Sequence, residues 1–179
     1  GMKTLLQPGI YDGYSEEQIR ALLDETWNRA AIQRYDDFSM TRESLVSGKF
    51  VNVVEEGGFS YRKIANQSPF PPREQDTNIF VFGGSSLFGY GVPDWDTLPS
   101  SLQGQLRRTH PRTRMNVFNF GRGYFYSTQE RILLERLLTK GVNVDVAVFV
   151  DGINEKGLED LPSVPYRDWD PSRCSPASL

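Results

Sequence analysis

Three short apolar runs, each followed by a polar turn that contains glycine, constrain the fold of this chain more than any other feature. The runs span residues 79–82, 115–120 and 144–150 and read IFVF, MNVFNF and VDVAVFV. Runs of this length, rich in β-branched and aromatic residues, are typical of strands that are buried on both faces. We therefore predict three core strands at these positions.

The two segments between these runs have the length and periodicity of helices. Leu98, Leu102 and Leu106 recur at helical spacing before the second strand, and Leu133 and Leu137 do so before the third. Alternation of strand and helix implies right-handed crossovers and a parallel sheet. We predict an α/β fold, a three-layer α/β/α arrangement of the flavodoxin-like kind, with its strands in the order 2-1-3.

The N-terminal part of the chain carries weaker signals. Ser15 and Gln18 form a capping box, and apolar residues at helical spacing then predict a helix over residues 15–34. A short strand at residues 50–54 is followed by an alternating pattern that is typical of a hairpin. These patterns divide the chain into a helical extension at residues 1–49, an α/β domain at 50–155 and an irregular tail at 156–179.

The composition excludes several classes of function. With a formal net charge of −3 and scattered Lys and Arg residues, the chain offers no electrostatic argument for nucleic acid or for an anionic membrane surface. No window approaches the ~20 apolar residues of a membrane span, so we expect a cytoplasmic protein. One cysteine and one histidine exclude an intrachain disulfide and the usual multi-histidine metal sites. We expect neither a metal nor a cofactor.

The turns that end the three strands hold the candidate chemistry. They read GGSS, NFGRG and DGINE, and the carboxyl ends of parallel strands lie side by side at the edge where ligands bind. A serine hydroxyl, main-chain N–H groups of a glycine turn and an asparagine amide are the groups that acyl transfer requires around a carbonyl. Ser85 is the candidate nucleophile. The alternative is a Gly-Ser loop without chemistry.

At these residues the chain resembles the SGNH, or GDSL-like, hydrolase superfamily, in the branch whose first motif reads Gly-Gly-Ser. The resemblance covers about residues 50–155. The family's first block, Gly-x-Ser-x-x-x-Gly, matches Gly83, Ser85 and Gly89. The resemblance therefore implies that Ser85 is the nucleophile and that it also contributes to the oxyanion hole.

The other two blocks match less closely. In the third block, Gly-x-Asn-Asp, Asn154 is the implied oxyanion donor, and Glu155 replaces the usual Asp. In the second block, Tyr124 stands where the family has its last glycine, and Gly123 lies one residue earlier. Either main-chain N–H is an implied donor, and Gly123 is our expected third member of the oxyanion hole. Tyr90 and Tyr124 are expected to border the substrate.

The base that the resemblance requires is missing. The family's final Asp-x-x-His block has no counterpart, because the chain contains no histidine after Glu155. His110 follows a helix of roughly 12 residues, which at ~1.5 Å per residue carries it about 18 Å away from the Ser85 turn. A base must come within ~3 Å of the hydroxyl or act through one water. Three interpretations remain open: a C-terminally shortened form of a longer enzyme, a base from another subunit, or loss of catalysis.

The sequence thus predicts a serine esterase or acyl hydrolase that acts on a lipid, acetyl or sugar ester. One alternative is a catalytically inactive SGNH-like module that binds a ligand or partner, and another is an acyltransferase. Nucleotide binding is disfavoured because GGSSLFG lacks the Gly-Lys-Ser/Thr ending of a phosphate-binding loop. A third strand at or near the sheet edge would leave unpaired backbone groups, which favours a homo-oligomer.

Overall fold

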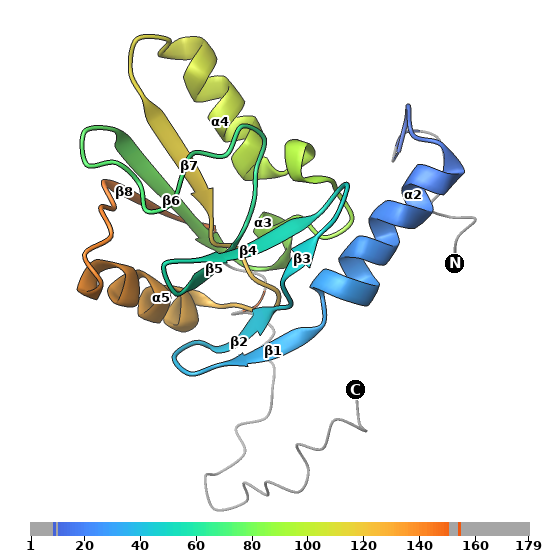
Figure 1. Cartoon of the computed structure of the whole chain (residues 1–179), viewed down its shortest axis with the longest axis horizontal. Helices are drawn as coiled ribbons and strands as arrows, with labels where there is room; N and C mark the ends of the chain where they lie inside the picture. Colours follow the sequence, from blue (N-terminus) through green and yellow to red (C-terminus); the bar gives the residue numbers. More distant parts are fainter. Residues whose placement is uncertain (1–8, 10, 151–153, 155–179) are drawn as a thin grey trace, which may run out of the picture.

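The computed structural model describes residues 9, 11–150 and 154 of the chain. It contains a six-stranded sheet in the order β3-β4-β5-β7-β6-β8, a separate two-stranded sheet, β1-β2, and helices on either side of the larger sheet (Figure 1). The strands are β1 Gln33–Asp36, β2 Met40–Glu43, β3 Val46–Ser47, β4 Asn52–Glu56, β5 Phe59–Arg62, β6 Thr77–Gly83, β7 Met115–Asn119 and β8 Val146–Val150. The helices are α2 Glu16–Leu23, η1 Asp24–Ala30, α3 Ser85–Phe88, η2 Asp94–Asp96, α4 Leu98–Thr109 and α5 Ser127–Thr139.

The three predicted core strands are β6, β7 and β8, and their predicted order is confirmed. β6 lies between the other two and pairs in parallel with both, so that Ile79 faces Val117 on one side and Val146 on the other. Every residue of β6 after Thr77 is buried. Among the described strands β8 is the last of the sheet and pairs only with β6.

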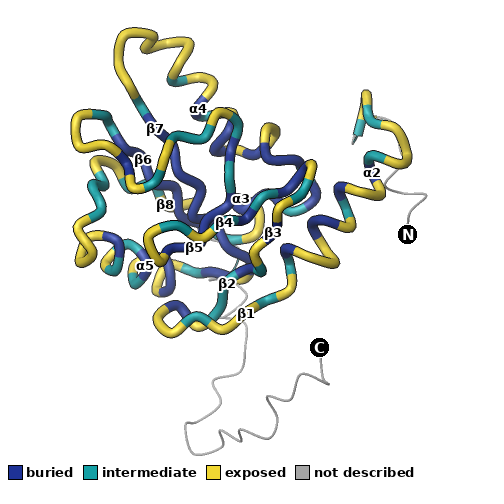
Figure 2. The backbone as a smooth tube through the Cα atoms, viewed as in Figure 1, coloured by how far each residue is buried: buried dark blue, intermediate teal, exposed yellow. Residues whose placement is uncertain are grey.

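The two faces of β6 and β7 are covered by different helices (Figure 1). Successive side chains of a strand point to opposite faces, and two separate clusters result. Phe80, Phe82, Phe118 and Phe120 pack with Leu133 and Leu137 of α5, whereas Ile79, Val81 and Val117 pack with Leu102 and Leu106 of α4. Figure 2 shows the buried strands between the exposed outer sides of these helices. The α/β layering is therefore as predicted.

The sheet is mixed, so the predicted parallel pairing holds for β6, β7 and β8 and does not extend to the other three strands. β3, β4 and β5 form an antiparallel meander, which includes the predicted hairpin. β5 then joins the parallel strands through one antiparallel pair, Arg62 with Asn119 of β7. The buried Arg62 side chain fixes this junction, because it bonds to loops that follow β6 rather than to its own strand neighbours.

The N-terminal helix begins as predicted and ends earlier. The Ser15–Gln18 capping box is present in both directions at the start of α2. The helix then continues as the π-helical η1 and stops at Ala30, whereas the prediction extended it to residue 34. It stops because the Ser44 N–H donates to the carbonyls of Ala30 and Ile32, which starts the β1–β2 hairpin.

One cluster joins the N-terminal segment to the sheet. Leu22 and Ala30 pack with Val46, Phe50 and Phe88, across the boundary expected at residue 50. No helix within the described residues has both the length and the apolar character needed to cross a bilayer. The predicted tail at 156–179 and two members of the third motif, Gly152 and Glu155, lie outside the described residues.

Candidate functional site

The Ser85 turn follows β6 directly at its carboxyl end. Gly83 closes the strand, Gly84 precedes the first helical residue, and Ser85 begins the four-residue helix α3. The Ser85 side chain is exposed, while Leu87 and Phe88 in the same helix are buried. The strand and the buried side chains of the short helix thus hold a serine hydroxyl at the surface.

Asn154 lies beside this turn. A Cβ atom on Gly84 would stand only 2.6 Å from Asn154 Nδ2, so the absence of a side chain at Gly84 admits the amide. The same amide donates a hydrogen bond to the Phe125 carbonyl, which links it to the turn after β7. Residues from the first and third predicted turns therefore lie together at one edge of the sheet.

The turn after β7 packs directly on α3. A Cβ atom on Gly121 would stand 2.5 Å from the Phe88 nitrogen, so only glycine allows this approach. The Arg122 N–H donates to the Gly83 carbonyl at 2.9 Å. All three predicted turns are thus neighbours.

The two main-chain donors proposed for the second turn differ in their environment. The Gly123 N–H donates to Glu43 Oε1 and is already engaged. The Tyr124 N–H makes no hydrogen bond with any residue that the structure describes. Tyr124 also has φ of +64°, a conformation that glycine adopts most readily. Of the two, Tyr124 is the one whose N–H is free.

A cavity of about 300 Å³ opens at Ser85. Its lining residues come from η1, α3 and the two neighbouring loops: Trp27, Ser85, Ser86, Tyr90 and Tyr124. Trp27 stacks on Tyr90 with 5.0 Å between the ring centroids. Trp27 lies in η1, is 54 % exposed and forms a wall of this cavity.

Glu43 is a residue of this site that sequence reasoning missed. Its side chain is buried and accepts hydrogen bonds from the Gly123 N–H and, at 2.8 Å, from the Tyr90 hydroxyl. Burial raises the pKa of the Glu43 carboxyl, although these hydrogen bonds and the charge of Arg122 oppose the shift. Burial and the Glu43 charge also raise the pKa of Tyr90, which therefore stays protonated at neutral pH as the donor. The polar segment at residues 35–49 gave no signal for this role.

Arg62 anchors the other end of α3. Its guanidinium donates to the carbonyls of Phe88 at 2.9 Å, Gly89 at 2.6 Å and Val92 at 2.6 Å. It also pairs with Asp94 at 3.0 Å, and its side chain is fully buried. Burial raises the pKa of Asp94, and Arg62 is the main group that opposes this shift. The turn that carries Ser85 is therefore held by a buried ion pair.

Arg122 is also structural. Its guanidinium donates to Ser39 Oγ and to the Thr41 carbonyl, and it lies 3.6 Å from Asp36. These partners belong to the β1–β2 hairpin or its turn. Arg122 is 3 % exposed, so it is neither a solvated charge nor a group at the cavity surface.

His110 lies away from this site, as expected. It follows α4 at the amino ends of β6 and β7, is exposed, and has Nδ1 2.8 Å from Thr109 Oγ1. It lines a separate cavity, which does not include Ser85. The only histidine of the chain therefore does not reach the serine hydroxyl.

No model of a known protein family matches this sequence, and no curated protein matches it either. The residues at the carboxyl edge of the sheet are therefore the basis for inferring a function.

Proposed function

We propose that this chain carries the nucleophile and the oxyanion-binding groups of a serine acyl hydrolase of the SGNH type, built on a flavodoxin-like α/β fold. One observation carries the proposal: the exposed Ser85 opens into a cavity at the strand end, with Tyr124 at its wall. The neighbouring Asn154 amide supplies a second polar group at the same edge.

In the proposed reaction, Ser85 Oγ attacks the carbonyl carbon of an ester. The carbonyl oxygen becomes an oxyanion, which the main-chain N–H groups of Ser85 and Tyr124 and the Asn154 amide stabilise by hydrogen bonds. The proton that Ser85 Oγ gives up to a base is passed to the leaving oxygen. The intermediate then collapses, the C–O bond breaks, the alcohol leaves, and an acyl-enzyme remains. Water then attacks the acyl-enzyme and releases the acid. Gly123, expected at first as a donor, takes a supporting role because its N–H binds Glu43.

The cavity favours a small substrate. Its volume of about 300 Å³ lies at the lower end of ligand pockets, and its walls are the rings of Trp27, Tyr90 and Tyr124. Aromatic walls suit a short acyl group or the apolar face of a sugar ring. Acetyl esters of small alcohols or sugars are the substrate class that we propose.

The acylation step needs a base, and the histidine of the chain is remote from Ser85. We therefore expect a slow reaction that added imidazole accelerates. The test measures release of alcohol from short acetyl esters, with and without imidazole, for the unaltered protein and for Ser85→Ala. Ser86→Ala is the matched comparison, because Ser86 is a neighbouring exposed serine in the same helix.

The expected result is a rate that depends on Ser85 and persists in Ser86→Ala. A fluorophosphonate should label the protein once, and the labelled peptide should contain the modified Ser85. Equal rates for Ser85→Ala and the unaltered protein at every imidazole concentration would contradict hydrolysis.

A binding module without catalysis is the second candidate. The position of His110 at the opposite edge of the sheet favours it. This candidate predicts that an acetylated sugar binds and shifts the fluorescence of Trp27 without turnover, and that Ser85→Ala binds as well. An acyltransferase would instead transfer the acyl group to an added alcohol in preference to water.

A further inference from the structure

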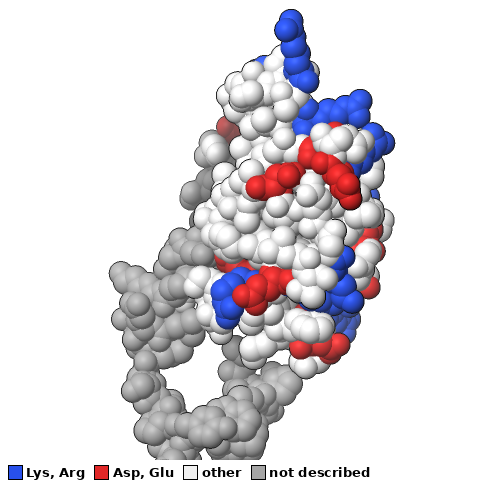
Figure 3. All heavy atoms as spheres, turned by 90° about the vertical axis from the view of Figure 1, so that its left-hand side faces the viewer, with Lys and Arg blue, Asp and Glu red and all other residues white. Residues whose placement is uncertain are grey.

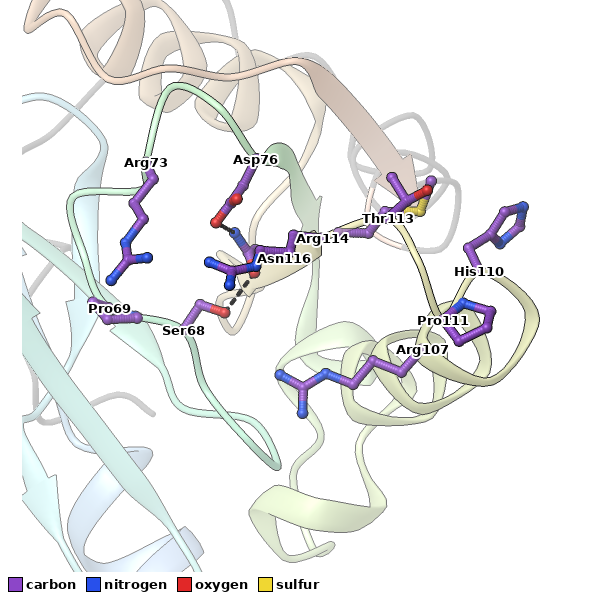
Figure 4. A pocket seen from close by; sticks show the side chains of 11 residues that line it. Ser68, Pro69, Arg73, Asp76, Arg107, His110, Pro111, Thr113, Arg114 and Asn116 are labelled. Carbon is purple, nitrogen blue, oxygen red and sulfur yellow. Dashed lines mark hydrogen bonds between the residues drawn. The ribbon is translucent and has the colours of Figure 1, made fainter.

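A second and larger cavity lies at the amino ends of β6 and β7 (Figure 4). It has a volume of about 510 Å³, and its walls come from the β5–β6 connection and from the end of α4 with the following loop. The residues that matter for its chemistry are Ser68, Arg73, Asp76, Arg107, Arg114 and Asn116. β6 is seven residues long, which at ~3.3 Å per residue puts about 20 Å between this cavity and Ser85.

Positive charge dominates the lining. Three guanidinium groups, of Arg73, Arg107 and Arg114, face a single carboxylate, Asp76. Asp76 Oδ2 accepts a hydrogen bond from the Asn116 amide at 3.2 Å and pairs with none of the three arginines. The cavity therefore has a surplus of uncompensated positive charge.

The guanidinium donors are largely unused. Within the described part of the chain, the side chains of Arg73 and Arg114 make no hydrogen bond and no ion pair. Arg107 donates from Nη2 to the Asn66 carbonyl at 3.0 Å and keeps its remaining N–H groups free. In Figure 4 the Arg73 and Arg114 side chains extend over the same space above Ser68 and Pro69.

The backbone that carries these arginines is held firmly. The Arg73 carbonyl accepts from Asn78 Nδ2 at 2.8 Å, and the Arg114 carbonyl accepts from the Thr77 N–H at 2.9 Å. Below them, Ser68 Oγ donates to Asn116 Oδ1 at 2.7 Å. The backbone beneath the free guanidinium groups is thus hydrogen-bonded to the first residues of β6 and β7. Less conformational entropy of the protein is therefore lost when a ligand binds.

The sequence concentrates charge at this place. Residues 107–114 read RRTHPRTR, and no Asp or Glu occurs from residue 97 to residue 129, in a chain whose net charge is −3. Figure 3 shows blue side chains gathered at the top of the molecule, at the height of the α4–β7 connection in Figure 1. A local surplus of this kind in an acidic protein attracts anions selectively.

We propose that this cavity binds a phosphorylated small molecule through Arg73 and Arg114, with Arg107 at its rim. Guanidinium forks bind phosphate oxygens bidentately, and several such groups match a phosphate or diphosphate better than a single carboxylate. The volume is that of a small-ligand site, which suits a compact molecule better than a long polymer. This site is independent of the function proposed at Ser85.

The experiment is a calorimetric titration of the full chain with sodium pyrophosphate. The variants are Arg73→Gln, Arg114→Gln and the double variant, and Arg131→Gln is the matched control. Arg131 is an exposed arginine on α5 that pairs with Glu135 of the same helix. Because Arg73 and Arg114 are also exposed, their variants should fold, which circular dichroism verifies.

We expect one pyrophosphate per chain, at least about tenfold weaker binding in the double variant, and unchanged binding in Arg131→Gln. Added salt should weaken binding of the unaltered protein more than that of the double variant. No heat signal at about 5 mM pyrophosphate, or equal affinity in the double variant, overturns the proposal. Equal affinity for citrate would show a general anion site and also overturns it. Stronger binding of a single-stranded oligonucleotide than of pyrophosphate would show a polymer-binding surface instead, which also overturns it.

Discussion

Replacing Arg62 with methionine tests whether the Ser85 turn depends on a buried cation. Methionine fills much of the same volume and keeps the contact with the Phe88 ring, over which the guanidinium lies at 4.9 Å. It removes four hydrogen bonds, to the carbonyls of Phe88, Gly89 and Val92 and to Asp94. The change therefore removes the charge and the hydrogen-bond donors of Arg62 while it keeps much of its packing.

The expected loss of unfolding free energy follows from the polar groups that lose the Arg62 guanidinium as their partner. Removing one partner of a buried ion pair costs about 3–5 kcal/mol, because the other charge stays buried and unpaired. Asp94 keeps only its bonds from Asn52 on the carboxylate. We expect a loss of about 4 kcal/mol, which for a chain of this size lowers Tm by roughly 8–16 °C. Urea unfolding followed by circular dichroism measures this, and Arg131→Met, at an exposed pair, should cost about 0.5 kcal/mol or less.

The pH dependence of the stability loss in Arg62→Met shows whether the unpaired Asp94 charge causes it. Burial already raises the pKa of Asp94, and without Arg62 the pKa should rise further. A carboxyl with a raised folded-state pKa stabilises the fold below its unfolded pKa and loses that contribution as the pH rises through the folded pKa. The loss in Arg62→Met should therefore be larger at pH 7 than at pH 5. A loss below about 1 kcal/mol, or one that is the same at both pH values, would refute the role of the stranded charge.

Two further changes probe the same edge of the sheet. Gly121→Ala places a Cβ 2.5 Å from the Phe88 nitrogen, and it should lower the unfolding free energy by about 2–3 kcal/mol in thermal unfolding. Gly104→Ala, in open space on α4, should raise it by about 0.5–1 kcal/mol. Equal effects of the two variants would contradict the packing of the Gly121 loop on α3. Burial raises the pKa of Glu43, so the contribution of this carboxyl to stability should fall as the pH rises above about 4.5. Glu43→Gln should remove that contribution and change the pH dependence of the urea midpoint accordingly. A pH dependence that the variant leaves unchanged would count against a buried Glu43 charge.

The parallel strands could be predicted because the signal for each one is contained in its own short run of residues. Strands buried on both faces read as continuous apolar runs, and this pattern correctly located β6, β7 and β8 and their order. The same reasoning places the turns that follow these strands at one edge of the sheet. The antiparallel part could not be predicted as well, because β1, β2 and β3 are only two to four residues long and show no period.

The side chains that support the site were also beyond sequence reasoning. Glu43 reaches Gly123 across 80 residues of the chain, and Arg62 reaches Phe88 across 26. Arg122 stands between two glycines, a setting that suggests solvent exposure, yet it is buried against the β1–β2 hairpin. Such pairings depend on tertiary contacts, which no local pattern encodes.

These three buried charges share one arrangement. Arg62 and Glu43 extend from the N-terminal strands to the loops after β6 and β7, and Arg122 extends from one of those loops back to the hairpin. Buried charges are costly unless they are paired, so each of these contacts fixes one strand against one loop. Removal of residues 33–47 would take away Glu43 and the hairpin partners of Arg122 together, and would leave the Gly123 N–H without its acceptor. The N-terminal segment is therefore a structural part of the candidate site rather than an extension added to it.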